Sequence, residues 1–197
     1  MKKILTSTLL ASTVLFLAFT KPKTETYKVD TQKSSIEWIG RKVSGQHNGT
    51  IKVAGGELVV NGAAVKGGFV NIDMNSIAVS DLQGEMNGKL VGHLKSDDFF
   101  STEKNPVSKF VIKKVTPAGN DRVNVTGDLT IKGITKSLTF PATVKKDGNV
   151  VVAVAKGVKV NRAQYDVRYG SKTFFADIAD KAIDDEFELA FNLVARK

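Results

Sequence analysis

Apolar and polar residues alternate along most of this 197-residue chain, with the period of two that is typical of half-buried β-strands. The clearest case lies near the C-terminus, where every second residue is apolar: Phe187, Leu189, Phe191, Leu193 and Ala195. Glu186, Glu188 and Asn192 lie on the other face. Because successive side chains of a strand point to opposite faces, we expect one face inside the fold and the other in solvent.

The same alternation recurs in several earlier segments. Their apolar faces are formed by Ile36 and Trp38, Ile51 and Val53, Leu58 and Val60, Phe110 and Ile112, then Val123, Val125, Leu129 and Ile131, and then Leu138, Phe140, Ala142 and Val144. A valine-rich strand follows, with an expected apolar face of Val150, Val152, Val154, Val158 and Val160. These segments are short enough to be strands of an antiparallel sheet.

Turn-forming residues separate the predicted strands. Glycine, asparagine and aspartate tolerate positive φ, and they recur at Gly55-Gly56, Asn61-Gly62, Gly67-Gly68, Gly119-Asn120-Asp121, Lys132-Gly133 and Asp147-Gly148-Asn149. About eight strands joined by tight turns predict an all-β antiparallel barrel, because closure removes exposed strand edges. A barrel of that size leaves room inside for side chains or for one slender ligand.

Residues 81–95 break this rhythm. Apolar residues recur there at three- and four-residue spacing, which predicts one short helix packed over the barrel: Leu82, Met86, Leu90, Val91 and Leu94. Ser80 or Asp81 is the expected N-cap. Three glycines each weaken this helix by up to about 1 kcal/mol relative to alanine, so we expect it to depend on packing. Phe99 and Phe100 follow it and are expected to reach the same core.

The N-terminal segment, residues 1–20, has the pattern of a secretory signal peptide. Lys2 and Lys3 precede an uncharged apolar run from Ile4 to Phe19. We therefore expect export to the periplasm or the medium and one mature domain over residues 21–197; an uncleaved N-terminal anchor is the alternative. The chain has no cysteine, which excludes a lipoprotein anchor, disulfides and thiolate metal sites. The domain must therefore be stabilised by burial.

Charge and candidate chemistry argue against two classes of function. The net charge is +9, but the lysines are scattered rather than clustered, which disfavours nucleic-acid binding. His47 and His93 lack the spacing of a metal site, and no nucleophile elbow is present. The acidic runs Asp97-Asp98 and Asp184-Asp185-Glu186 are typical of solvated turns. We expect neither an enzyme nor a cofactor.

A series of segments along the chain resembles the YceI family of bacterial periplasmic proteins. The residues that carry the resemblance are Val29-Asp30, Ser34 to Trp38, Ile72 to Ile77, Gly92 to Phe100, Asn105-Pro106, Gly127 to Lys136, and Val160-Asn161-Arg162. The resemblance implies a lipocalin-like barrel whose tunnel accepts a long apolar molecule, such as a polyisoprenoid, a quinone or a fatty amide. Lys33 stands where many members have histidine, and Ser80 and Leu82 replace a common arginine and threonine. These departures concern the ligand's head group more than the fold.

We expect the ligand to contact a set that is mainly aromatic and aliphatic, because ligand pockets are largely apolar. The set is Trp38, His47, Phe69, Met74, Met86, Leu90, Leu94, Phe99, Phe110, Phe140, Arg162, Phe174 and Phe191. Filling of an ordinary core is the alternative for each apolar member. His47 either hydrogen-bonds a head group or is a half-buried structural residue. Arg162 either joins a buried network with Asp128 or meets an anionic head group.

Three functions follow from these patterns. The first is an exported protein that holds an isoprenoid-like lipid or quinone for transport, storage or sequestration, with transient contact with a membrane surface. The second is an envelope barrel with a filled core that acts through its surface in a stress response. The third is an unrecognised hydrolase or lyase. An internal cavity of suitable size favours the first over the second.

Overall fold

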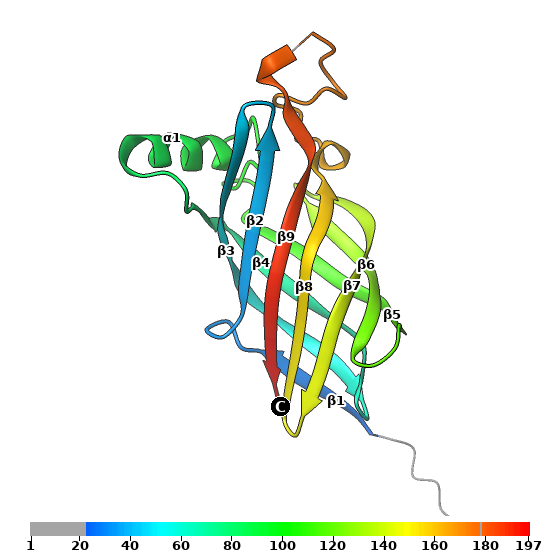
Figure 1. Cartoon of the computed structure of the whole chain (residues 1–197). Helices are drawn as coiled ribbons and strands as arrows, with labels where there is room; N and C mark the ends of the chain where they lie inside the picture. Colours follow the sequence, from blue (N-terminus) through cyan, green and yellow to red (C-terminus); the bar gives the residue numbers. More distant parts are fainter. Residues whose placement is uncertain (1–22, 178) are drawn as a thin grey trace, which may run out of the picture.

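The computed structural model describes residues 23–177 and 179–197, so the predicted signal segment lies outside the described residues. Figure 1 shows a tall barrel with a helix beside its upper end. The elements are β1 (Thr24–Val29), β2 (Ser35–Lys42), β3 (Gly45–Asn61), β4 (Ala64–Val79), α1 (Gly84–Lys95), β5 (Val107–Pro117), β6 (Arg122–Ile131), β7 (Ile134–Asp147), β8 (Val150–Asn161), η1 (Arg162–Tyr165), η2 (Ala179–Lys181) and β9 (Ile183–Arg196).

The strands form one closed antiparallel sheet. The order β3-β2-β9-β8-β7-β6-β5-β4 closes on itself through the pairing of β4 with β3. The short strand β1 also pairs with β3 and β9, below the point where β2 pairs with the same two strands. β1 and β2 therefore share one position in the ring, and the predicted eight-stranded barrel is confirmed.

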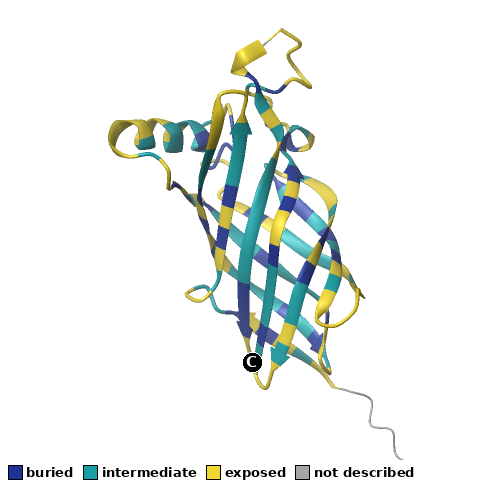
Figure 2. Cartoon of the chain, in the orientation of Figure 1, coloured by how far each residue is buried: buried dark blue, intermediate teal, exposed yellow. Residues whose placement is uncertain are grey.

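Alternation along the strands sets which residues face the interior (Figure 2). It does so as predicted in β9, where Phe187, Leu189, Phe191 and Leu193 face the interior cavities. In β8 the expected valine face is correct after the bulge, where Val158 and Val160 are buried, and wrong before it. A bulge between Ala155 and Val158 shifts the register against β9, with Gly157 at a φ of 65°. Before the bulge, the fully buried residue is Val151, so Val150, Val152 and Val154 lie on the opposite face.

Helix α1 begins at Gly84, three residues after the predicted start, and its N-cap Gln83 makes no side-chain capping hydrogen bond. Neither Ser80 nor Asp81 caps it; the Asp81 carboxylate instead accepts a hydrogen bond from the backbone N–H of Asn48. The helix packs against β4, and Leu94 is its one fully buried residue. Among the described helices, none has the length and apolar character to cross a membrane.

The lower end of the barrel, beside β1 and the C-terminus, is filled by a tightly packed group that we call the base plug. It consists of Tyr27, Leu58, Val60, Val151 and Ala195, each at most 1% exposed. The Tyr27 hydroxyl donates a hydrogen bond to the carbonyl of Gly148, in the β7–β8 turn. The barrel is therefore solid at this end, and any internal space lies above it.

Close packing inside the wall makes Gly127 intolerant of a side chain. A Cβ atom there would lie 2.4 Å from the Phe110 ring and 2.5 Å from the carbonyl oxygen of Val111. We expect Gly127→Ala to lower the free energy of unfolding by about 1–3 kcal/mol, as overpacking does. Gly88→Ala in α1 meets open space and should raise it by up to about 1 kcal/mol. Urea denaturation of both variants tests this contrast, and equal effects would contradict it.

Candidate functional site

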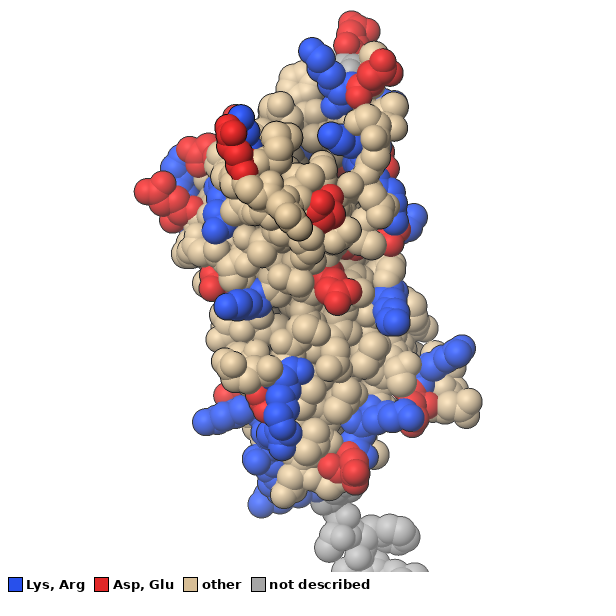
Figure 3. Space-filling view, turned by 60° about the vertical axis from the view of Figure 1, so that its left-hand side comes forward, with Lys and Arg blue, Asp and Glu red and all other residues tan. Residues whose placement is uncertain are grey.

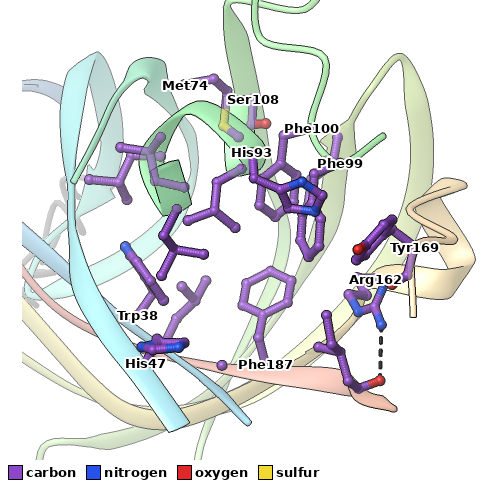
Figure 4. Close-up of a pocket in the computed structure, with 18 of the residues that line it drawn as sticks. Trp38, His47, Met74, His93, Phe99, Phe100, Ser108, Arg162, Tyr169 and Phe187 are labelled. Carbon is purple, nitrogen blue, oxygen red and sulfur yellow. Dashed lines mark hydrogen bonds between the residues drawn. The ribbon is translucent and has the colours of Figure 1, made fainter. Parts of the chain in front are cut away.

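The upper half of the barrel contains a cavity of about 320 Å³, which we call the upper chamber. Three parts of the chain frame its upper end: the end of the β2–β3 hairpin, helix α1, and the segment between η1 and β9. Carbon atoms form most of its wall. The apolar residues that line it include Ile36, Trp38, Ile51, Met74, Ile77, Leu90, Leu94, Phe99, Phe100, Ile131 and Phe187 (Figure 4).

A second cavity of about 100 Å³, the lower chamber, lies between the upper chamber and the base plug. All of its lining residues are apolar, and three aromatic rings meet there. The ring centroids of Phe110 and Phe140 are 5.5 Å apart, and those of Phe140 and Phe191 are 5.7 Å apart. A polar head group would find no hydrogen-bond partner at this depth.

Four side chains line both chambers and form what we call the waist: Ile36, Ile72, Leu129 and Leu189. They come from the neighbouring strands β2 and β9, from β6 on the opposite side of the ring, and from β4. The two chambers thus adjoin at mid-height across these apolar side chains.

Most polar groups around the upper chamber already have partners. The Trp38 indole N–H donates to the carbonyl of Ala78 at 3.1 Å, and Arg41 pairs with Glu188 at 2.9 Å. His47 Nδ1 lies 2.8 Å from the Asp81 carboxylate. Burial opposes ionisation of Asp81, but the hydrogen bonds from the Asn48 N–H and from His47 outweigh it and lower its pKa. These pairs fix the wall of the chamber.

Arg162 is 2% exposed, and its guanidinium binds four backbone carbonyls. Nε donates to Asp184, Nη1 to Val167 and Tyr169, and Nη2 to Ile183, at 2.8–3.0 Å. Burial lowers the pKa of Arg162, and the carboxylates of Asp185 and Asp184 oppose that effect. The guanidinium therefore ties the chain after η1 to the start of β9.

This geometry corrects one of the two expectations for Arg162. Asp128 is not its partner, because that carboxylate lies on β6 beside Lys113, 3.2 Å from the ammonium. The nearest carboxylate to Arg162 is Asp185, at 3.7 Å. An anionic head group would also have to compete with four carbonyl acceptors that already hold the guanidinium.

His93 is the polar residue of the chamber that the expected set of ligand contacts did not include. Its ring lies between those of Tyr169 and Phe99, with centroids 4.4 and 5.6 Å away. Its Nε2 atom is buried and has no hydrogen-bond partner among the described residues. A buried polar atom without a partner costs about 1–3 kcal/mol. His93 follows Leu90 by three positions, so the helical spacing of the apolar face was the signal for it.

The other predicted contact residues fall into three groups. Trp38, His47, Met74, Leu90, Leu94, Phe99 and Arg162 line the upper chamber, and Phe110, Phe140 and Phe191 line the lower one. Phe69, Met86 and Phe174 line neither. Whether the lining residues contact a ligand stays a prediction.

Each of the three misplaced residues has a physical reason. In β4 the inward positions include Val70 and Ile72, so Phe69 faces outward, with the Lys109 ammonium 4.6 Å above its ring. Met86 lies in the first turn of α1 and is 60% exposed. Phe174 lies outside any strand, 39% exposed, with the Arg168 guanidinium 4.9 Å from its ring. Its neighbour Phe175 is also exposed, so neither faces inward.

No group of three or more metal-ligating side chains occurs in the parts of the chain that the structure describes. The chamber's chemistry is therefore that of a carbon-lined channel with one unpartnered imidazole nitrogen near its upper end.

Comparisons with known proteins point in one direction. The model of the YceI-like domain matches residues 27–195. A "UPF0312 protein" of Shewanella denitrificans is 33% identical over 156 residues, which are 75% of this chain and 76% of that protein. A second one, from Pseudomonas putida, is 30% identical over 125 residues, covering 62% of this chain and 63% of that one.

Solved structures agree with the fold. BcnA of Burkholderia cenocepacia has a TM-score of 0.68 and 26% identity, covering 85% of this chain and 99% of its own. A polyisoprenoid-binding domain from Saccharophagus degradans, implicated in plant cell wall breakdown, has a TM-score of 0.64 and 16% identity, with coverage of 86% and 97%. The Campylobacter jejuni YCEI protein has a TM-score of 0.52 and 21% identity, with coverage of 100% and 99%.

Proposed function

This chain belongs to the YceI-like family, and we propose that it holds one long apolar lipid, isoprenoid-like in shape, in the channel formed by the two chambers. The observation that carries the proposal is the channel itself. It is lined mainly by apolar side chains, its two chambers adjoin at the waist, and it is blocked below by the base plug. Its upper part alone reaches the size of a small-molecule site, about 300–1,000 Å³. A linear chain of methyl-branched carbons suits such a shape.

The proposed orientation places the hydrocarbon tail downward and the head group in the upper chamber. The lower chamber has only apolar walls, so a polar group there would lose its hydrogen bonds to water without replacement. In the upper chamber, His93 Nε2 is free to donate to an oxygen of the ligand or to accept from a hydroxyl or amide.

The charges around the chamber favour an uncharged head group. Arg41 and Arg162 line it, but Glu188 holds the first and backbone carbonyls hold the second. Lys42 is exposed at the rim. A diphosphate would need several unengaged cations around it, whereas a quinone, alcohol or amide needs one hydrogen-bonding group. We therefore propose a neutral lipid and a binding function, not catalysis.

The cellular site that fits this function is the envelope. Lys2, Lys3 and the apolar run that follows them support export, and an isoprenoid-like lipid would otherwise stay in the membrane. A protein of this kind would carry, store or sequester the lipid between membranes.

The proposal is tested by titrating delipidated protein with a long polyprenol, a long-chain ubiquinone and squalene, which lacks a head group. Saturable binding of the first two, one molecule per chain, is the expected result. Absence of saturable binding for all three would remove the proposal and leave a barrel that acts through its surface.

His93→Leu separates the head-group contact from the fit of the tail. We expect affinity for ubiquinone and polyprenol to fall about 3- to 10-fold, the worth of one hydrogen bond of about 1 kcal/mol, while squalene binding stays unchanged. The ligand-free variant should be at least as stable as wild type, because an unpartnered buried nitrogen is removed. Equal losses for all three lipids would mean that His93 acts through shape alone.

A further inference from the structure

The exposed large apolar side chains of this protein are gathered around the opening of the upper chamber. Six are exposed in the described residues: Val43 (58%), Met86 (60%), Val107 (50%), Tyr169 (49%), Phe174 (39%) and Phe175 (48%). All but Val107 lie on the β2–β3 turn, on α1 or on residues 166–177. These three parts lie at the same end of the barrel (Figure 1). The distribution is not that of scattered surface residues.

The same three parts also supply the rim of the chamber. The β2–β3 hairpin contributes Lys42 and His47, α1 contributes Leu90 and His93, and residues 166–177 contribute Tyr169. Tyr169 belongs to both sets, since it lines the chamber and is 49% exposed. Tyr169 thus connects the exposed apolar residues to the cavity.

The charges near this opening are balanced. Between residues 166 and 177 they are Asp166, Arg168, Lys172 and Asp177, two of each sign. At the opposite end, Lys28, Lys66 and Lys146 lie around the base plug, and Figure 3 shows lysine and arginine gathered there. An electrostatic attraction to anionic surfaces would therefore draw the lower end, not the open one.

We propose that the open end of the barrel docks on a lipid bilayer, with Val43, Phe174 and Phe175 entering the head-group region. This inference rests on the proposed function: docking would let the lipid enter or leave the channel through the opening. A bilayer fits better than a protein partner, since the apolar side chains come from three separate segments around a hole and offer no continuous flat patch. Aromatic rings are well suited to the membrane interface.

The test is co-sedimentation of the full mature chain with phosphatidylcholine vesicles. Wild type is expected to bind, with little change at about 0.5 M salt, which screens charge interactions. Phe174→Asp combined with Phe175→Asp should lower the partition coefficient at least about tenfold, since two apolar groups that enter the bilayer are replaced by charges. The matched control is Val107→Asp, an exposed apolar residue at the start of β5, outside the three parts that carry the other exposed apolar side chains, which should bind like wild type.

Several outcomes would overturn the docking proposal. One is vesicle binding that requires phosphatidylglycerol, disappears at high salt and is lost in the double variant Lys28→Glu, Lys146→Glu. The lower end would then be the docking face. Another is a wild-type dimer that the Phe174 and Phe175 substitutions convert to monomer, because a second copy would then cover these residues. Unchanged binding of the double Phe variant would overturn it as well.

Failure of docking and failure of the proposed function are distinguishable. Polyprenol delivered from ethanol measures cargo binding without vesicles, so saturable polyprenol binding without vesicle binding removes docking alone. Vesicle binding without any saturable lipid removes the carrier function and leaves a membrane-associated barrel. Both readings require that wild type and the double Phe variant unfold at the same midpoint. We expect equal midpoints because the two rings are exposed.

Discussion

Ile72→Trp is expected to abolish binding of long polyprenols while short ones still bind. Ile72 belongs to the waist and is only half-buried because its side chain faces the channel. The added ring fills empty space. The free energy of unfolding should therefore change by less than the roughly 1–3 kcal/mol that overpacking of a filled core costs. A tail that cannot pass the waist loses about 0.8 kcal/mol for each methylene left in water. The affinity for a long chain should therefore fall at least about a hundredfold.

The matched control is Ile39→Trp, the same substitution on β2 at a residue that lines neither chamber. Titration of both variants with polyprenols of increasing length is the measurement. Wild type should gain affinity with length until the lower chamber is full, and Ile72→Trp should stop gaining at a shorter chain. If both variants follow the wild-type curve, the waist is not on the ligand's path.

Arg162→Met should produce the largest loss of stability of any single substitution considered for this chain. It leaves the carbonyls of Val167, Tyr169, Ile183 and Asp184 without their donor. The bond to Val167 is buried and the other three are partly buried. Because a buried carbonyl without a partner costs about 1–3 kcal/mol and a solvent-accessible one much less, we expect a loss of about 2–4 kcal/mol in the free energy of unfolding. That is a large part of the roughly 5–15 kcal/mol that stabilises a typical domain.

Urea denaturation measures this effect, and two further variants interpret it. Arg162→Lys keeps the charge but has three donors on one atom, so it should recover only part of the loss. Arg41→Met removes a pair with Glu188 that is partly exposed, and should cost less than about 1 kcal/mol. A loss for Arg162→Met no greater than that of Arg41→Met would show that the carbonyl contacts contribute little.

The barrel was predictable because alternation and turn residues are local signals, and β9 carries both without interruption. The inward face of β8 before the bulge at Gly157 was not, because residues 150–155 are all valine or alanine, and hydrophobicity does not distinguish the two faces there. The glycine itself was the available signal. The start of α1 was misplaced because Asp81 had a competing partner, and that partner lies on β3, far away in the sequence.

For the candidate site too, the positions of the residues that local sequence signals describe were predicted correctly, and those of the others were not. Trp38, Phe110 and Phe191 lie in strands, so their inward direction followed from alternation. Phe174 does not, and its exposure depends on a loop that no periodicity describes. Arg162 was identified as important, but its partners are backbone carbonyls, which carry no sequence signal. The role of His93 depends on which of its atoms lack a partner, which only the packed structure reveals.

The base plug gives the proposed ligand one way in and the same way out. A lipid that enters tail first must leave head first, and it stays in one orientation throughout, so every encounter with an acceptor begins at the head group. When the ligand leaves, its tail moves past the waist one segment at a time, and each methylene that enters water costs about 0.8 kcal/mol. If that cost raises the activation barrier for dissociation, each methylene slows dissociation by a factor of about four. Residence time should therefore lengthen steeply with chain length, so the barrel would act as a timer as well as a container, discharging short lipids quickly and keeping long ones.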